Sequence, residues 1–156
     1  MKFLSYIIIL LMLFSINSIR SQTENDYYNT AMMRIKYHDY TGAIKDLDKA
    51  IKINPKDDIL YYERGLTKRF LNDKIGAISD FDKAIEINKS NVEAYFFRGI
   101  TKYELQDYRG AIKDYDEVIN YDPRHAGAYY SRGVAKIYLG NTTDGYLDIK
   151  IASKLK

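Results

Sequence analysis

The chain has 156 residues, 46% of them hydrophobic and 29% charged, which suits one domain with a packed core and a hydrated surface. It contains no cysteine, so disulfides, a thiolate metal site and a cysteine nucleophile are excluded. The formal net charge is only +3, and the two histidines, His38 and His125, lie far apart near turn-like segments. The sequence therefore offers no catalytic or metal-binding pair.

The first 21 residues differ from the rest of the chain. Lys2 precedes an apolar run at residues 3–14, and small and polar residues follow up to Ser21. This layout is typical of a secretory signal peptide, and the run is shorter than the roughly 20 residues that a transmembrane helix needs. We predict a signal peptide at residues 1–21 and a secreted or periplasmic mature chain. An uncleaved leader that anchors the chain in the membrane is the alternative.

Removal of this leader would change the charge of the chain. It takes away two cations, Lys2 and Arg20, and no acid, so the formal charge falls from +3 to +1. Nucleic-acid binding demands a concentrated basic surface. The sequence therefore predicts no nucleic-acid partner.

From residue 24 onward the sequence repeats every 34 residues without an insertion. The repeated units are 24–57, 58–91, 92–125 and a shorter 126–156, all within a predicted domain at residues 22–156. Corresponding positions carry a tyrosine, a small residue, a second small residue and a large apolar residue. In that order the columns are Tyr27, Tyr61, Tyr95 and Tyr129; Ala31, Gly65, Gly99 and Gly133; Ala43, Ala77, Ala111 and Gly145; and Leu47, Phe81, Tyr115 and Ile149.

Each unit is predicted to form two helices. In the second unit, residues 75–87 place apolar side chains at helical spacing and not in strand alternation. Pro55 and Pro123 favour an end to the second helix of their units, because the residue before a proline avoids helical geometry. A short polar residue opens each second helix and is expected to cap it: Asp39, Asp73, Asp107 and Asn141.

A 34-residue helix–turn–helix unit with these columns resembles the tetratricopeptide repeat family, over residues 24–156. The resemblance implies an all-α fold, an α-solenoid of stacked antiparallel helix pairs with four units in a right-handed superhelix. One unit cannot bury its apolar stripe alone, so neighbouring units are expected to bury each other's stripes. The departures are modest: Thr30 and Ala31 replace Arg-Gly in the first unit, Lys89 replaces a proline, and Gly145 replaces an alanine.

An Arg-Gly pair recurs in the first helix of the second, third and fourth units. A phosphate-binding loop places glycine between a strand and a helix, whereas Gly65 follows residues already inside a helix. No GxxxxGK[ST] or GxGxxG pattern occurs in the chain. We therefore expect these arginines to be structural. The favoured pairs join each unit to its predecessor, as Arg64–Asp46, Arg98–Asp80 and Arg132–Asp114, and pairing within the unit, such as Arg64 with Asp80, is the alternative.

The resemblance also implies a concave groove, lined by the first helices, that holds an extended peptide or a helix. The residues expected there are mostly apolar and aromatic, as is typical of an interaction surface. They lack the lysine and asparagine with which acidic-tail binders of the family clamp a terminal carboxylate. The predicted groove residues are Tyr28, Met32, Ile35, Ile59, Tyr62, Leu66, Arg69, Phe70, Phe96, Ile100, Tyr103, Tyr130, Val134, Ile137 and Tyr138.

Two other interpretations of this surface stay open. The side chains could cover one another inside a tight superhelix, or residues 1–22 could fill the groove. Self-association through the same surface is a further alternative.

The sequence thus predicts an exported, non-catalytic scaffold or adaptor that binds a peptide or helix of another protein and needs no cofactor. The alternative is a structural or oligomerisation subunit of a cell-envelope assembly. Membrane contact is expected only through an uncleaved leader. No nucleophile–base pair, metal cluster or phosphate loop in the sequence supports an enzyme.

Overall fold

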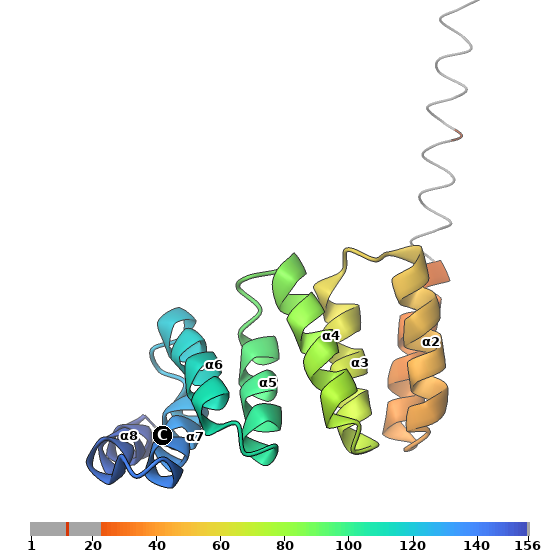
Figure 1. Cartoon of the computed structure of the whole chain (residues 1–156). Coiled ribbons are helices and arrows are strands. Elements are labelled where there is room, and N and C mark those ends of the chain that lie inside the picture. Colours follow the sequence, from red (N-terminus) through yellow and green to blue (C-terminus); the bar gives the residue numbers. More distant parts are fainter. Residues whose placement is uncertain (1–11, 13–22, 156) are drawn as a thin grey trace, which may run out of the picture.

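The computed structural model describes residue 12 and residues 23–155, and the described part is helical with short turns (Figure 1). Residues 23–36 form the first helix of the solenoid. It is followed by α2 (Tyr40–Ile53), α3 (Asp58–Phe70), α4 (Lys74–Ile87), α5 (Val92–Glu104), α6 (Tyr108–Tyr121), α7 (Ala126–Tyr138) and α8 (Thr142–Lys154).

The helices stand side by side in chain order, and each packs mainly on its neighbours in the chain (Figure 1). Contacts between the two helices of a pair and between consecutive pairs make up the stack. This arrangement confirms the predicted all-α solenoid of helix pairs. The predicted leader at residues 1–21 lies outside the described residues apart from Met12. Among the described residues, no helix is both long enough and apolar enough to cross a bilayer.

The second helices of the first three units begin with a side-chain cap. The carboxylate of Asp107 accepts a hydrogen bond of 2.9 Å from the backbone N–H of Gly110, and the other two aspartates repeat this contact with Gly42 and Gly76. The prediction is wrong for the fourth unit, because Asn141 makes no side-chain cap bond. There Thr142 and Thr143 take the places of the residues that lie between cap and glycine in the other units.

This difference supplies a matched pair of variants. Replacing Asp107 with alanine is expected to lower the free energy of unfolding by about 1 kcal/mol, because the N–H of Gly110 loses its acceptor. Replacing Asn141 with alanine is expected to have a much smaller effect, since no cap bond is lost. Urea denaturation followed by circular dichroism measures both. Equal losses for the two variants would contradict the assignment of Asp107 as the cap.

The turn between the helices of each pair needs one residue in the left-handed region. His38, Asn72 and Gln106 have φ values of 61–64°, and Gly140 has a φ of 85°. These residues occupy the same position of the 34-residue repeat. Glycine adopts this conformation without steric cost, whereas the other three accept some strain.

Small residues allow the two helices of a pair to approach closely. A Cβ atom on Gly65 would lie 2.7 Å from the Phe81 ring, and one on Gly99 would lie 2.8 Å from the Tyr115 ring. Phe81 and Tyr115 are at most 1% exposed, so they fill the space that each glycine leaves. The glycine column thus holds the large apolar column in the core.

Candidate functional site

The arginine column forms ion pairs, but not the pairs favoured from the sequence. Arg64 donates from Nε and Nη2 to Asp80 at 3.0 and 2.6 Å, and from Nη1 to Asp48 at 2.6 Å. Arg98 and Arg132 repeat this pattern. The predicted pairs Arg64–Asp46, Arg98–Asp80 and Arg132–Asp114 are therefore wrong. The observed pairs are Arg64 with Asp80 and Asp48, Arg98 with Asp114 and Asp82, and Arg132 with Asp148 and Asp116.

The physical reason lies in the geometry of the second helix. Asp46 and Asp48 are two residues apart, so they point about 200° apart around α2. Asp46 faces the first helix of its own unit, whereas Asp48 faces the next unit. Sequence analysis considered one aspartate per unit and missed the second column, Asp48, Asp82 and Asp116, which the 34-residue alignment already displays.

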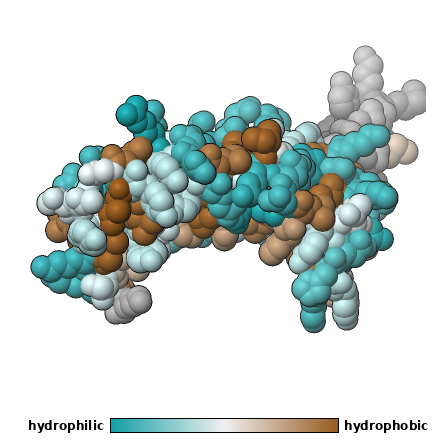
Figure 2. Space-filling model, turned by 60° about the horizontal axis from the view of Figure 1, so that its bottom comes forward, coloured by the Kyte–Doolittle hydropathy of each residue, from teal (hydrophilic) through white to brown (hydrophobic). Residues whose placement is uncertain are grey.

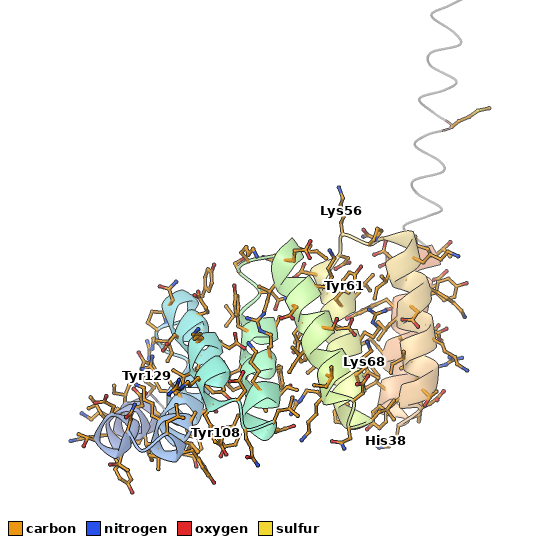
Figure 3. The ribbon with its side chains drawn as sticks, in the orientation of Figure 1. His38, Lys56, Tyr61, Lys68, Tyr108 and Tyr129 are labelled. Atoms are coloured by element: carbon orange, nitrogen blue, oxygen red, sulfur yellow. The ribbon has the colours of Figure 1, made fainter. Side chains whose placement is uncertain are left out.

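A lysine completes each cluster. Lys68 reaches from α3 to the Asp80 carboxylate on α4 at 2.8 Å (Figure 3), and Lys102 and Lys136 repeat this contact with Asp114 and Asp148. The aspartates are 2–4% exposed, so each is a buried anion held by two cations. These clusters are fully paired, which makes them structural and not ligand-binding.

The first unit reaches a similar result with other residues. It has Thr30 where the later units have arginine, and Arg34 where they have lysine. Arg34 Nη1 lies 2.9 Å from the Asp46 carboxylate. Lys49 binds the other carboxylate oxygen at 3.1 Å and lies 4.9 Å from the Tyr27 ring, much as Arg64 lies over the Tyr61 ring. The first unit therefore pairs its buried aspartate without a preceding unit.

The fifteen predicted groove residues differ in exposure. Ile59, Phe70, Tyr130 and Tyr138 are 50–63% exposed, whereas the other eleven are half-buried. Tyr62 lies 6.0 Å from the Phe97 ring, so part of this surface is covered by neighbouring side chains. We call the fifteen residues the inner surface. Seen from below the view of Figure 1, hydrophobic side chains form patches between hydrophilic ones (Figure 2).

One rim of the solenoid joins consecutive units through alternating contacts. Tyr40 stacks on Phe70 at 4.9 Å and Tyr108 stacks on Tyr138 at 5.0 Å, both measured between ring centroids. At the junction between them, Lys74 forms an ion pair of 3.3 Å with Glu104. His38 and Tyr108 mark this lower rim in Figure 3. Each junction thus has its own pair, and the rim aromatics are partly used for stacking the units.

A hollow of about 380 Å³ opens between α5 and α7 on the inner surface. Its walls are mostly aromatic and aliphatic, with the hydroxyl of Ser131 at one side. The lining residues are Ile100, Tyr103, Tyr115, Tyr130, Ser131 and Val134. Four of them were predicted groove residues, whereas Tyr115 and Ser131 were missed, because sequence analysis counted Tyr115 as core and did not consider Ser131.

The inner tyrosines remain neutral at physiological pH. Burial raises the pKa of Tyr62 to about 12 and that of Tyr103 to about 12, and the latter also carries a hydrogen bond with Tyr138. Their rings therefore offer apolar contact area together with a hydroxyl group at the tip. Such side chains suit the binding of another polypeptide.

The two histidines have separate structural contacts. His38 Nδ1 lies 2.9 Å from the Tyr40 hydroxyl, and His125 accepts the backbone N–H of Ala128 at 3.0 Å as the cap of α7. The His125 ring also packs 4.7 Å from the Phe96 ring. Within residues 23–155, no group of three or more metal-ligating side chains gathers in one place.

These features define a class of protein: an α-solenoid of helix pairs, held together by small-residue contacts and repeated ion pairs, with an aromatic inner surface. A family model described as TPR repeat matches residues 38–68 and 99–140, and a model described as tetratricopeptide repeat matches residues 59–91. Together they span more than half of the chain. The chain therefore belongs to the tetratricopeptide-repeat proteins.

Solved structures share this fold. A crystal structure of MamA is 20% identical with a TM-score of 0.83, covering 90% of this chain and 82% of that one. The first TPR domain of Spaghetti (RPAP3), bound to an HSP90 peptide, is 26% identical with a TM-score of 0.74, covering 77% and 95%. YrrB, a TPR protein with an unusual peptide-binding site, is 24% identical with a TM-score of 0.77, covering 87% and 70%. A search of curated protein sequences finds no match.

Proposed function

We propose that this protein is an exported, non-catalytic scaffold that binds a peptide or helix of another protein on its inner surface. The observation that carries the proposal is the exposure of large apolar side chains there: Phe70, Tyr130 and Tyr138 are each more than half exposed. Apolar groups held open on a rigid helical face are typical of an interaction site.

Two of the similar structures support a peptide as the occupant. One is described with a bound HSP90 peptide and the other as having a peptide-binding site. Peptide binding of this kind needs a shaped surface and no reactive group. The buried charges of this chain are already paired with one another, which leaves the inner surface as the part available for a partner.

Substitution of two open residues tests this proposal. In Ile59→Ser/Tyr130→Ser, both side chains are at least 50% exposed in the wild type, so the change costs little folding stability. We expect recovery of the binding partner to fall at least tenfold, because contact area at the centre of a binding surface is lost. Quantitative mass spectrometry of proteins that co-purify with the full chain measures the effect.

A matched control uses an exposed tyrosine away from the inner surface. Tyr146 on α8 is 65% exposed, and Tyr146→Ser is expected to leave partner recovery unchanged. Equal losses in both variants, or no loss in either, would count against the inner surface as the binding site.

The alternative function, a structural or oligomerisation subunit, draws on a different face. Tyr146 and Leu147 on α8 are 65% and 56% exposed, and they could join copies of the chain. Light scattering separates the two functions. A monomer leaves peptide binding in place, whereas a defined oligomer that Tyr146→Ser dissociates would favour the structural role. Export is tested separately by sequencing the N-terminus of the protein isolated from cells.

A further inference from the structure

We propose that the inner surface selects a segment with a lysine or arginine placed at Glu63 and an uncharged apolar residue placed in the hollow beside Ser131. This inference rests on the proposed function and adds the chemistry of the partner. It differs from the binding of an acidic tail, which would require cations on this surface.

One column of the repeat explains why the two ends of the surface differ. Glu63, Phe97 and Ser131 occupy the same position of the 34-residue repeat, on α3, α5 and α7. The contacts of Phe97 show where this position points: its ring lies 6.0 Å from the Tyr62 ring and 5.7 Å from the Arg69 guanidinium on the preceding first helix. The column therefore places a carboxylate, a phenyl ring and a small hydroxyl at successive junctions of the inner surface.

The carboxylate of Glu63 has no partner within residues 23–155. It is half-buried, and no side chain of the described part forms an ion pair or hydrogen bond with it. Burial raises its pKa, as expected for a carboxylate that has lost water and gained no cation. Its charge contributes to raising the pKa of Tyr28 and Tyr62, which places it between two predicted groove residues.

The charges around Glu63 favour a cation in the partner. Glu93, on the next first helix, is exposed, and its charge also acts on Tyr62. Arg69, the nearest inner cation along α3, is already bound to Glu104 at 2.6 Å. Lys36, also a cation, is exposed near the end of the first helix. A lysine or arginine from a partner would pair with Glu63 and lie beside the Tyr28 and Tyr62 side chains, an environment that suits a cation.

The hollow at the other end exists because Ser131 is small. At the preceding junction the equivalent residue, Phe97, packs against Tyr62, Phe96 and Arg69 and fills the corresponding space. At Ser131 the space of about 380 Å³ stays open and is lined by Ile100, Tyr103 and Val134, among others. These walls carry no charge, so a leucine, methionine or phenylalanine side chain fits their chemistry.

The distance between the two positions sets the spacing in the partner. Neighbouring packed helices lie about 8–10 Å apart, so two junctions of the inner surface are roughly 20 Å apart. An extended chain covers about 3.3 Å per residue, which gives roughly six residues between the cation and the apolar side chain.

Peptide selection tests this inference. A random library of roughly 12-residue peptides is displayed on phage and selected on the full chain, and fluorescence anisotropy then measures Kd for the enriched peptides. We expect a lysine or arginine with an apolar residue about six positions away. Glu63→Gln is expected to weaken these peptides about tenfold, and Glu63→Lys to shift the selection toward acidic residues. Ser131→Phe is expected to remove the preference for the apolar residue.

The controls separate binding from folding. Glu117→Gln changes an exposed carboxylate on α6, a second helix, and is expected to leave Kd unchanged. Glu63→Gln should melt no earlier than the wild type, because it removes a half-buried charge without breaking a contact. If Ser131→Phe fails to fold by circular dichroism, Val134→Asp tests the same hollow by adding a charge at its exposed lining.

Each outcome bears on one proposal. If no peptide is enriched on the wild-type chain, both peptide binding on the inner surface and this inference fail. If peptides are enriched without a cation, or if Glu63→Gln binds them as well as the wild type does, the inference is overturned and the proposed function stands.

Discussion

Replacing Arg132 with alanine is expected to lower the free energy of unfolding by about 3 kcal/mol. Arg132 donates two hydrogen bonds of 2.8 Å to Asp148 on α8 and one of 2.7 Å to Asp116 on α6, so one side chain joins three helices. Asp148 is 3% exposed, and in the variant its buried carboxylate would keep only Lys136 as a partner. Urea denaturation at neutral pH measures the loss.

The effect should depend on pH in a defined direction. Burial alone would raise the pKa of Asp148, but hydrogen bonds from Arg132 and Lys136 outweigh it, so the pKa is lowered in the folded protein. A lowered carboxyl pKa gives stability that is present above the unfolded pKa of about 3.9 and is lost as the pH falls through the folded value. The difference between wild type and Arg132→Ala should therefore be constant near neutrality and shrink below about pH 4.

An exposed ion pair serves as the control. Lys83 lies 2.8 Å from Glu86 within α4, and both side chains are exposed to solvent to a large extent. Lys83→Ala is expected to leave the urea midpoint unchanged, because water screens such pairs. An Arg132→Ala variant as stable as Lys83→Ala would show that the buried cluster does not hold the last unit.

Replacing Gly133 with alanine is expected to lower the free energy of unfolding by about 2 kcal/mol, although alanine is the better helix former by about 1 kcal/mol. The added Cβ would lie 2.6 Å from the carbonyl oxygen of Gly145, an atom of the α8 backbone. A backbone atom cannot rotate away, so α7 and α8 would have to separate. Thermal unfolding measured by circular dichroism tests this expectation.

Gly127 in the same helix provides the matched control. A Cβ there would meet the His125 ring at 3.2 Å, and this side chain can move. Gly127→Ala is therefore expected to leave stability unchanged or to raise it slightly. If both glycine variants behave alike, the close approach of α7 and α8 does not limit stability.

Much of the fold could be predicted from repetition. A tyrosine, two small residues and a large apolar residue recur every 34 residues, and each has a fixed role in packing one helix on the next. Local chemistry also gave the caps at Asp39, Asp73 and Asp107. It was wrong at Asn141, because a residue type that can cap does not fix the side-chain direction.

The candidate site was less predictable, because it depends on which repeat positions face each other in space. The interval of 34 residues indicated that Arg64 meets an aspartate, yet it could not distinguish Asp46 from Asp80. Nor did it indicate that Glu63 is left without a partner while the buried aspartates each have two.

The sequence by itself determined the helix pairs, their order and the small-residue contacts, because these are set by local periodicity and nearest-neighbour packing. Tertiary structure alone decided the ion-pair partners and the shape of the inner surface. Both depend on how side chains from separate units meet: Arg64 joins two helices, and the hollow beside Ser131 opens because the phenyl ring found at the preceding junction is absent there.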